Sequence, residues 1–430
     1  MMPRLRHFLM AGLVLAMPLI GTAASADDSA TKSELQQLRT QLQAQKQRMD
    51  ALEGLLRNTI AKDVSNLRER VDAVAEKADG AAVASWPNKV KLKGDFRYRH
   101  EMIDEEKKDT DRHRHRFRMR IGIDASPTED LDLHFRMVSG SDDPVSTNQS
   151  LDGGFSSKGL WIDRAYADYH PDALGGAHLL AGKMGVPFFK PGKEQLIWDG
   201  DLSIEGMALK HSLKPSETTK IFTTIGAFWV EENSSHADNM LYAAQLGVQQ
   251  HISEDAKLTF GASCFRYTDT KGSPTFFDNE DGFGNSTEEG EDDELLYLED
   301  YHLVEGFAQL DFKAGDLPIS LYGDYVKNID ADSSEDTGWL AGIKLGKAKK
   351  PGTWQLGYNY RVLEADAVIG AYSDSDFNGG GTGGKGHKLS AAYQINKAAQ
   401  FAVTYLINED EPSTDEDTYR RLQLDFKLKF

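Results

Sequence analysis

The chain has 430 residues, 27% of them charged, and carries a formal net charge of −19 at pH 7. Such an acidic chain is poorly suited to nucleic acid, whose phosphates repel it, so we expect no nucleic-acid partner. Cys264 is the single cysteine, which excludes an internal disulfide. We expect Cys264 to lie within a strand as a small apolar side chain.

Residues 1–26 have the features of a secretory signal peptide. Arg4 and Arg6 supply a basic start, and an apolar run follows from Phe8 to Ile20. Ala24-Ser25-Ala26 is a typical cleavage site. The apolar run is short for a membrane-spanning helix, and no other stretch approaches the roughly 20 apolar residues that such a helix needs. We therefore expect an exported protein without a transmembrane helix.

Residues 27–78 have the period of an amphipathic helix. Their apolar residues recur at intervals of three or four, with an offset of one residue after Leu56: Leu35, Leu38, Leu42, Met49, Leu52, Leu56, Ile60, Val64, Leu67, Val71 and Val74. This spacing predicts a periplasmic coiled coil with a discontinuity, roughly 70 Å long. A lone amphipathic helix lying on another surface is the alternative. Residues 79–87, mostly small, are expected to form a linker that ends at Trp86-Pro87.

Residues 88–430 have the period of β-strands. We find about sixteen strand-like segments, whose connections alternate between short and long, as in outer-membrane barrels with short periplasmic turns and long external loops. Ser126-Pro127-Thr128 and Lys397-Ala398 are short connections, whereas Val186–Gly200 and Thr270–Leu296 are long ones. The sequence therefore predicts an all-β transmembrane barrel of about 16 antiparallel strands, preceded by an α-helical coiled-coil segment.

The last nine residues show the strand pattern most clearly. Five apolar residues alternate with polar ones, and the chain stops on an aromatic: Leu422, Leu424, Phe426, Leu428 and Phe430. We expect the apolar face to meet lipid, and this strand to pair with the first one so that the barrel closes. A C-terminal strand of a soluble sandwich is the alternative.

Tryptophan positions agree with a membrane barrel. Trp86 and Trp354 fall at predicted periplasmic strand starts. The others fall at predicted external strand ends: Trp161, Trp198, Trp229 and Trp339. Aromatic girdles at the two membrane interfaces are expected from this distribution.

The second predicted strand, His113–Ala125, has the most unusual composition. Its arginines share one parity, while Phe117, Ile121 and other apolar residues share the opposite one. An arginine that faces lipid at mid-bilayer costs about 2–4 kcal/mol, so these arginines are expected to face the lumen. With arginines of the neighbouring strands they would form a basic wall suited to an anion path: Arg97, Arg99, Arg114, Arg116, Arg118, Arg120 and Arg136.

The alternative reading of this wall is structural. Acidic residues on the same strands would neutralise the arginines and stiffen the barrel: Asp95, Glu101, Asp132, Asp163 and Asp168. The two roles can combine, because a porin eyelet commonly sets a basic wall against acids on an inward-folded third loop. Here that loop is Val186–Gly200, whose aromatic and aliphatic residues are unusual for a solvated loop. Folding inward would aim three acids at the arginines: Glu194, Asp199 and Asp201.

Two further loops are acidic or glycine-rich. The acidic run between Asp278 and Glu294 is expected to be a solvated loop, with a Ca²⁺ or Mg²⁺ site bridging lipopolysaccharide phosphates as the alternative. Ser373–Gly384, with Asp374, Asp376 and many glycines, is expected to be a flexible loop, with a metal site as the alternative. The sequence contains no G-x-S-x-G, H-E-x-x-H or Walker motif, so we expect no catalytic residues, no resident metal and no cofactor.

Several segments, in their order along the chain, resemble the bacterial "putative porin" family of outer-membrane proteins. They are Trp86-Pro87-Asn88-Lys89-Val90, Gly94-Asp95-Phe96-Arg97-Tyr98-Arg99, Asp163-Arg164-Ala165-Tyr166, Gly182-Lys183-Met184, and Trp198-Asp199 through Glu205-Gly206. The resemblance implies a trimeric barrel channel for small solutes, often with an N-terminal coiled coil. It does not name a solute.

We therefore expect an outer-membrane porin that gives passive diffusion of small hydrophilic solutes, with an arginine-lined, anion-favouring lumen. Expected partners are outer-membrane lipid and lipopolysaccharide, the barrel assembly machinery, and two further copies in a homotrimer. The alternative function is a structural tether, whose coiled coil contacts peptidoglycan or an envelope partner.

Overall fold

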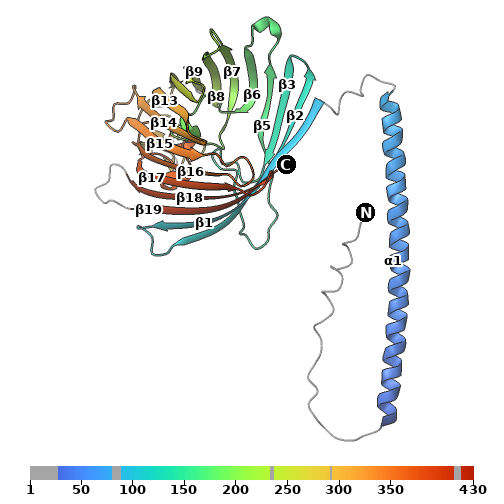
Figure 1. The fold of residues 1–430 in the computed structure, drawn as a ribbon. Helices are drawn as coiled ribbons and strands as arrows, with labels where there is room; N and C mark the ends of the chain where they lie inside the picture. Colours follow the sequence, from blue (N-terminus) through green and yellow to red (C-terminus); the bar gives the residue numbers. More distant parts are fainter. Residues whose placement is uncertain (1–27, 80–88, 233–236, 291–292, 411–417) are drawn as a thin grey trace. The chain divides into compact units, whose positions relative to one another are not determined.

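The computed structural model describes residues 28–79, 89–232, 237–290, 293–410 and 418–430 (Figure 1). The expected signal peptide 1–26 lies outside the described residues, as does the expected linker apart from residue 79. The chain forms two compact units, residues 1–84 and 85–430.

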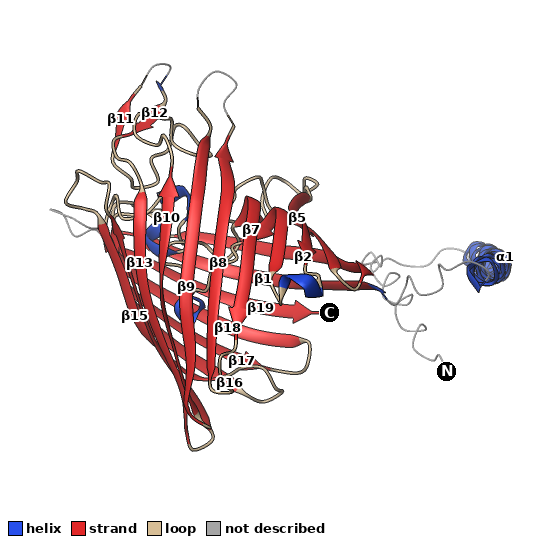
Figure 2. Ribbon diagram, turned by 90° about the horizontal axis from the view of Figure 1, so that it is seen from above, coloured by secondary structure: helices blue, strands red, loops and turns tan. Residues whose placement is uncertain are grey.

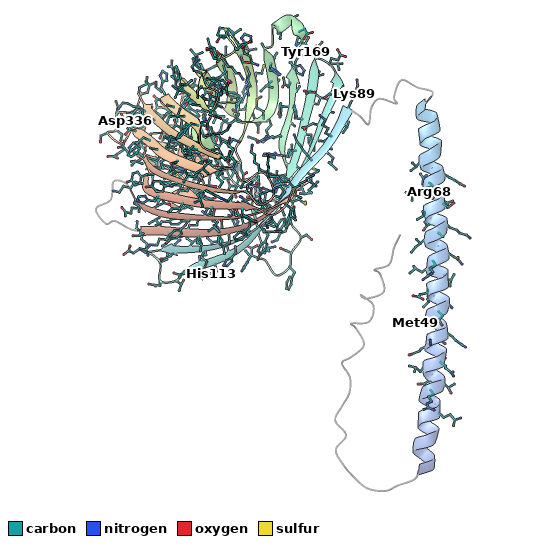
Figure 3. The ribbon with its side chains drawn as sticks, in the orientation of Figure 1. Met49, Arg68, Lys89, His113, Tyr169 and Asp336 are labelled. Carbon is teal, nitrogen blue, oxygen red and sulfur yellow. The ribbon has the colours of Figure 1, made fainter. Side chains whose placement is uncertain are left out.

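The first unit contains one long helix, α1 (Asp28–Asp79, 52 residues). Leucine, alanine, glutamine, lysine, arginine and glutamate dominate it, and these are strong helix formers. Side chains such as Met49 and Arg68 project outward from the helix (Figure 3). None of the helices in the described residues is long and apolar enough to cross a membrane.

The second unit is a closed β-barrel. Within the described residues, sixteen antiparallel strands each pair with the next in the chain, and the last pairs with the first (Figures 1 and 2). The strands are β1 (Val90–Glu105), β2 (Arg112–Thr128), β3 (Leu131–Val138), β5 (Trp161–Tyr169), β6 (His178–Gly185), β7 (Ser203–Leu213), β8 (Thr219–Glu231), β9 (Asn239–Ser253), β10 (Ala256–Tyr267), β13 (His302–Ala314), β14 (Leu317–Asn328), β15 (Thr337–Gly346), β16 (Trp354–Leu363), β17 (Gly384–Gln394), β18 (Ala399–Asp410) and β19 (Thr418–Lys429). The predicted barrel and its strand number are confirmed.

Short additional elements decorate the barrel. The two-residue strand β4 (Gln149–Ser150) pairs with β2, and a separate hairpin joins β11 (Thr287–Glu289) to β12 (Leu295–Tyr297). This hairpin stands at the end of the barrel that carries the long loops (Figure 2). Short 3₁₀ helices complete the structure: η2 (Asp172–Leu174), η3 (Pro191–Lys193), η5 (Gly370–Tyr372) and η6 (Phe377–Gly379).

Closure of the barrel depends on β1 and β19. Tyr98 lies opposite Phe426, and Arg99 lies opposite Asp425, in an antiparallel register that runs along both strands. Because side chains alternate, Tyr98 and Phe426 are exposed on the outer face while Arg99 and Asp425 are buried. β19 thus presents its apolar side outward, and no sheet edge is left open between the two strands.

The barrel is not an empty tube, because three long loops fold into it. Loops 186–202, 268–301 and 364–383 pack apolar side chains against the inner faces of the strands. The resulting core includes Phe188, Leu196, Ile197, Trp198, Phe228, Phe265, Phe276, Tyr297, Leu303, Leu340, Val368 and Ile369. Apolar burial of this size holds the loops in place.

Two sequence expectations about these loops are wrong. Trp198 does not belong to an external girdle, because loop 186–202 turns inward and Trp198 packs against Phe265, with ring centroids 5.2 Å apart. Ser373–Gly384 is not a flexible loop: Ser373 is buried, and its hydroxyl donates to the carbonyl oxygens of Gly370 and Gly381. Among the described residues, four tryptophans are exposed, in keeping with girdle positions: Trp161, Trp229, Trp339 and Trp354.

Candidate functional site

Strand alternation turns the arginines of β1 and β2 inward. Arg97, Arg99 and Glu101 are buried, whereas Tyr98, between the two arginines, is exposed. The four arginines of β2 at alternating positions are largely buried as well, with side-chain exposures of 12–20%: Arg114, Arg116, Arg118 and Arg120. The alternation of arginine with apolar residues in the sequence of β2 predicts this inward-facing side.

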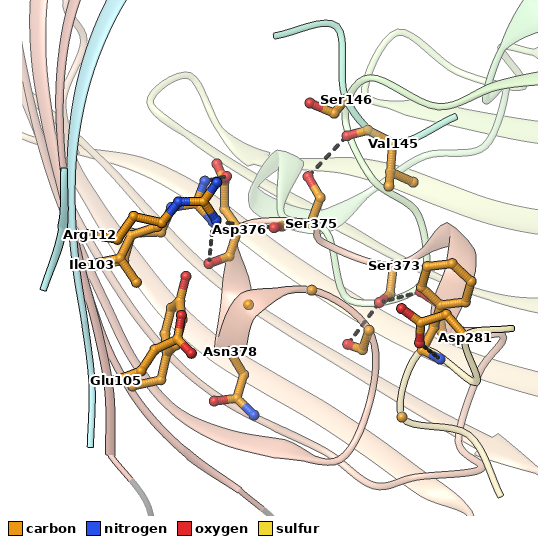
Figure 4. Close-up of a pocket in the computed structure, with 18 of the residues that line it drawn as sticks. Ile103, Glu105, Arg112, Val145, Ser146, Asp281, Ser373, Ser375, Asp376 and Asn378 are labelled. Atoms are coloured by element: carbon orange, nitrogen blue, oxygen red, sulfur yellow. Dashed lines mark hydrogen bonds and ion pairs between the residues drawn. The ribbon is translucent and has the colours of Figure 1, made fainter. Parts of the chain in front are cut away.

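These side chains line two cavities inside the barrel. The first, of about 590 Å³, lies among the long loops and includes Arg114 and Arg116; we call it the long-loop cavity (Figure 4). The second, of about 1040 Å³, extends to the short turns and includes Arg118 and Arg120; we call it the short-turn cavity. The arginines therefore follow the lumen from one cavity to the other.

Two carboxylates join the arginines of the short-turn cavity. Asp95 accepts from Arg118 at 2.9 Å and from Arg120 at 2.7 Å. Asp201 lies 3.5 and 3.3 Å from the same guanidinium groups and also accepts from the Thr147 hydroxyl at 2.9 Å. Asp201 thus lies within ion-pair distance of two arginines of β2.

A second network joins β1, β2 and β19. Glu101 is fully buried and lies 2.8 Å from Arg421, 2.9 Å from Arg114 and 3.4 Å from Arg99. Arg99 also binds Asp425 through two hydrogen bonds. Each of these charges is compensated at close range, which is the condition for burying it.

The arginine on the third strand belongs to a separate pair. Arg136 binds Asp163, which also lies 3.9 Å from Arg164, and neither large cavity includes Arg136. Two of the acids expected to neutralise the wall bind histidines instead: Asp132 binds His170 at 3.3 Å, and Asp168 binds His178 at 2.9 Å.

The acids of loop 186–202 do not all face the arginines. Glu194 lies against the far wall, 2.7 Å from Lys344 on β15 and 3.4 Å from Lys388 on β17. Burial opposes ionisation of this loop carboxyl, yet Lys388 and Lys344 lower the pKa of Glu194 to about 2. The expectation that Glu194 meets the predicted arginine wall is wrong, because the loop crosses the lumen before Glu194 is reached.

Asp199 binds another loop. Its carboxylate accepts from the Ser375 amide at 3.0 Å, the Ser375 hydroxyl at 3.1 Å and the Asp201 amide at 2.6 Å. Asp199 therefore joins loop 186–202 to loop 364–383. The expectation that Asp199 contacts the predicted arginines is also wrong.

The sequence of the barrel matches one protein family. A family model described as "Putative porin" matches residues 104–302 and 290–430, well over half of the chain. The chain belongs to this family. The porin lies in the bacterial outer membrane and is a channel, as its family and barrel fold together indicate. No curated protein matches the chain.

Several solved structures are similar to the porin at low sequence identity. Pseudomonas putida OprB, in a structure at high pH, is 12% identical with a TM-score of 0.56, over 82% of the porin and 97% of that chain. Salmonella typhi OmpF in complex with daunomycin is 11% identical with a TM-score of 0.48, over 79% and 97% of the two chains. The outer membrane channel DcaP of Acinetobacter baumannii is 15% identical with a TM-score of 0.44, over 79% and 97%.

Sequence reasoning missed several charged residues of the lumen. Arg421 and Asp425 occupy the polar parity of the last strand, so the alternation that predicted its lipid face also marked them as inward. Lys344 and Lys388 carried no such signal, because each is an isolated lysine whose partner depends on the path of a distant loop.

Two further predictions concern Cys264 and metal binding by the acidic loop. Cys264 lies within β10, as expected, with its sulfur 3.1 Å from Nε2 of His302. Among the described residues, no group of three or more His, Cys, Asp or Glu side chains is arranged to hold a metal ion.

Proposed function

We propose that the porin lets small hydrophilic solutes diffuse passively through its lumen and that it favours anions. An excess of basic groups on one wall carries this proposal. In the described part of the barrel, seven arginines share five carboxylates through ion pairs: Arg97, Arg99, Arg114, Arg116, Arg118, Arg120 and Arg421 with Asp95, Glu101, Asp201, Asp376 and Asp425. Guanidinium groups stay charged and bind anions through several donors, so this wall favours anions.

Loop 186–202 is proposed to narrow the path. Asp201 touches the arginines of β2, while Glu194 is held by lysines of the opposite wall. A loop fixed at both walls restricts the opening between them. The buried side chains of Leu196, Ile197 and Trp198 support a stable restriction rather than a mobile one.

The test replaces Arg116, which lines the long-loop cavity, and Arg118, which lines the short-turn cavity, by alanine. In planar bilayers with a salt gradient, we expect the chloride-to-potassium permeability ratio to fall about twofold or more. The matched control, Lys62→Ala with Lys271→Ala, removes two positive charges from the α1 surface and an external loop. An equal change in both double variants would contradict a role for this wall in selectivity.

We further propose that residues 1–26 are removed after export and that residues 27–78 form a periplasmic coiled coil in a homotrimer. Apolar side chains along α1 are exposed: Leu42, Met49, Leu52, Leu55, Leu56, Ile60, Val64, Leu67 and Val71. Association with two other copies would bury this stripe, which costs free energy when it faces water. The spacing of the stripe is that of coiled coils.

A structural tether is the second candidate function. The same stripe on α1 is equally available to an envelope partner, and the helix would then anchor the barrel to peptidoglycan or to that partner. Contacts with lipopolysaccharide and with the barrel assembly machinery remain predictions.

A further inference from the structure

The tip of loop 364–383 separates the two cavities of the lumen. Ser375 and Asp376 line the long-loop cavity and also line the short-turn cavity, and no other described residue lines both. The two cavities therefore adjoin at these two residues. Figure 4 shows Ser375 and Asp376 among the residues that line the long-loop cavity, together with Ile103 and Glu105 of β1.

Asp376 bridges two arginines of the basic wall. Its Oδ1 lies 2.7 Å from Nη2 of Arg421 on β19, and its Oδ2 lies 3.2 Å from Nη1 of Arg99 on β1. The two arginine side chains are 3% and 5% exposed, whereas the Asp376 side chain is 24% exposed. The carboxylate is thus the accessible member of a site whose cations are buried.

The loop backbone is held at the same place. Nη1 of Arg421 donates to the carbonyl oxygens of Ser375 at 3.3 Å and Asp376 at 3.5 Å. The Ser375 hydroxyl lies 3.0 Å from the carbonyl oxygen of Val145 on loop 139–160 and 3.1 Å from the Asp199 carboxylate. Three loops therefore meet at Ser375, and Asp376 is presented to the arginines by a fixed backbone.

The arginine cluster has more donors than the protein's acceptors use. Nε of Arg97, Arg116 and Arg421 is buried in each case without a hydrogen-bond partner among the described residues. Burying a donor without a partner is unfavourable. The carboxylates of the cluster therefore do not satisfy all of its guanidinium donors.

The charge state of Asp376 agrees with this arrangement. Burial opposes its ionisation, but Arg421 and Arg99 hold the pKa of this loop carboxyl well below its usual range. An ionised carboxylate on two guanidinium groups has the same chemistry as a carboxylate solute on them.

We propose that Asp376 is a specificity-determining residue of the channel: its carboxylate occupies, on Arg99 and Arg421, the position that a permeating anion takes, so anions must displace it. This inference rests on the proposed function of the barrel as an anion-favouring porin. Asp376 then acts as an internal competitor, which sets how strongly the cluster holds an anion between the two cavities.

The test compares acetate block of chloride current in the full-length parent, Asp376→Asn and Asp376→Glu, in planar bilayers. Acetate carries the same carboxylate as the Asp376 side chain. In Asp376→Asn, acetate should reduce the current at a concentration about tenfold lower than in the parent, because the charged competitor is gone. Asp376→Glu keeps the charge and should stay close to the parent.

Asp281→Asn is the matched control. Asp281 lines the same long-loop cavity, and its carboxylate accepts from the Phe283 amide rather than from an arginine. This variant removes the same charge from the same cavity, so it should leave the acetate concentration unchanged. Equal acetate sensitivity of Asp376→Asn and Asp281→Asn would overturn the inference. Heat-dependent gel mobility verifies that each variant is folded.

The results separate this inference from the proposed function. If the parent favours anions and Asp376→Asn shows no increase in acetate sensitivity, the inference fails and the proposed function stands. If the parent favours cations but Asp376→Asn becomes acetate-sensitive, the proposed anion preference fails and the role of Asp376 stands.

Discussion

Arg99 on the first strand donates two hydrogen bonds to Asp425 on the last strand, at 2.6 and 3.0 Å. The two side chains are 5% and 3% exposed, so the ion pair lies inside the wall at the seam where the barrel closes. A planar guanidinium matches both carboxylate oxygens, and this geometry fixes the register of β1 against β19 as well as neutralising the charges.

Asp425→Ala should therefore lower the free energy of unfolding by about 3–5 kcal/mol, because it leaves buried arginines without their carboxylate. Urea unfolding in detergent, followed by gel mobility, measures the change. The control is Asp104→Ala, which breaks a half-exposed pair with Arg420 between the same two strands. Surface pairs contribute at most about 1 kcal/mol to stability. An equal loss of unfolding free energy in both variants would contradict a special stabilising role of the Arg99–Asp425 pair.

Trp198 should control the width of the path. It is 2% exposed and packs with Phe188 and Phe265, so Trp198→Ala removes the largest side chain that holds loop 186–202 inside the barrel. A buried Trp→Ala change costs about 3–5 kcal/mol. We expect a looser loop and a larger, noisier single-channel conductance. Trp339→Ala is the control, since Trp339 lies on an exposed face; similar traces from both variants would contradict the restriction.

The anchor of loop 186–202 at Glu194 should resist acid. The pKa of Glu194 is lowered to about 2 from a usual 4.5. The ion pairs with Lys344 and Lys388 therefore contribute fully above the unfolded pKa near 4.5, and their contribution is lost as the pH falls through about 2. Single-channel conductance should stay constant from about pH 7 to pH 5.

Glu194→Gln should release the loop already at neutral pH and raise the conductance. Glu205→Gln is a matched control, because Glu205 also binds a lysine, Lys183, at 2.7 Å, but its side chain is 60% exposed. If the conductance changed in the Glu205 variant and not in the Glu194 variant, the ion pairs of Glu194 would not be what holds loop 186–202 in the lumen.

Deleting residues 28–79 separates the channel from the tether. The barrel closes through its own strands, β1 to β19, so the shortened porin should conduct with the same current per barrel. A trimeric coiled coil predicts fewer trimers in native gels after the deletion. A tether predicts instead that trimers persist while attachment of the outer membrane to peptidoglycan weakens in cells.

Local periodicity explains which features were predictable. The alternation in His113–Ala125 fixes the side on which Arg116 and Arg118 lie, because neighbouring residues of a strand point to opposite faces. Closure by the last strand follows from the same rule. The lysine partners of Glu194 could not be predicted from periodicity, because they depend on how far loop 186–202 extends across the lumen.

The position of Asp376 was the least accessible from sequence. It lies in a glycine-rich stretch that has the composition of a solvated loop. Its burial depends on packing among loops 139–160, 186–202 and 364–383, through contacts such as Ser375 with Asp199 and Val145. Such contacts between distant segments leave no periodic trace.

The most direct measurement is the current through the purified, full-length porin in a planar bilayer with a potassium chloride gradient. We predict stepwise conductance increases, as single channels insert, and a reversal potential on the chloride side. Absence of conductance from folded protein would contradict the channel, and a reversal potential on the potassium side would contradict the anion-favouring wall.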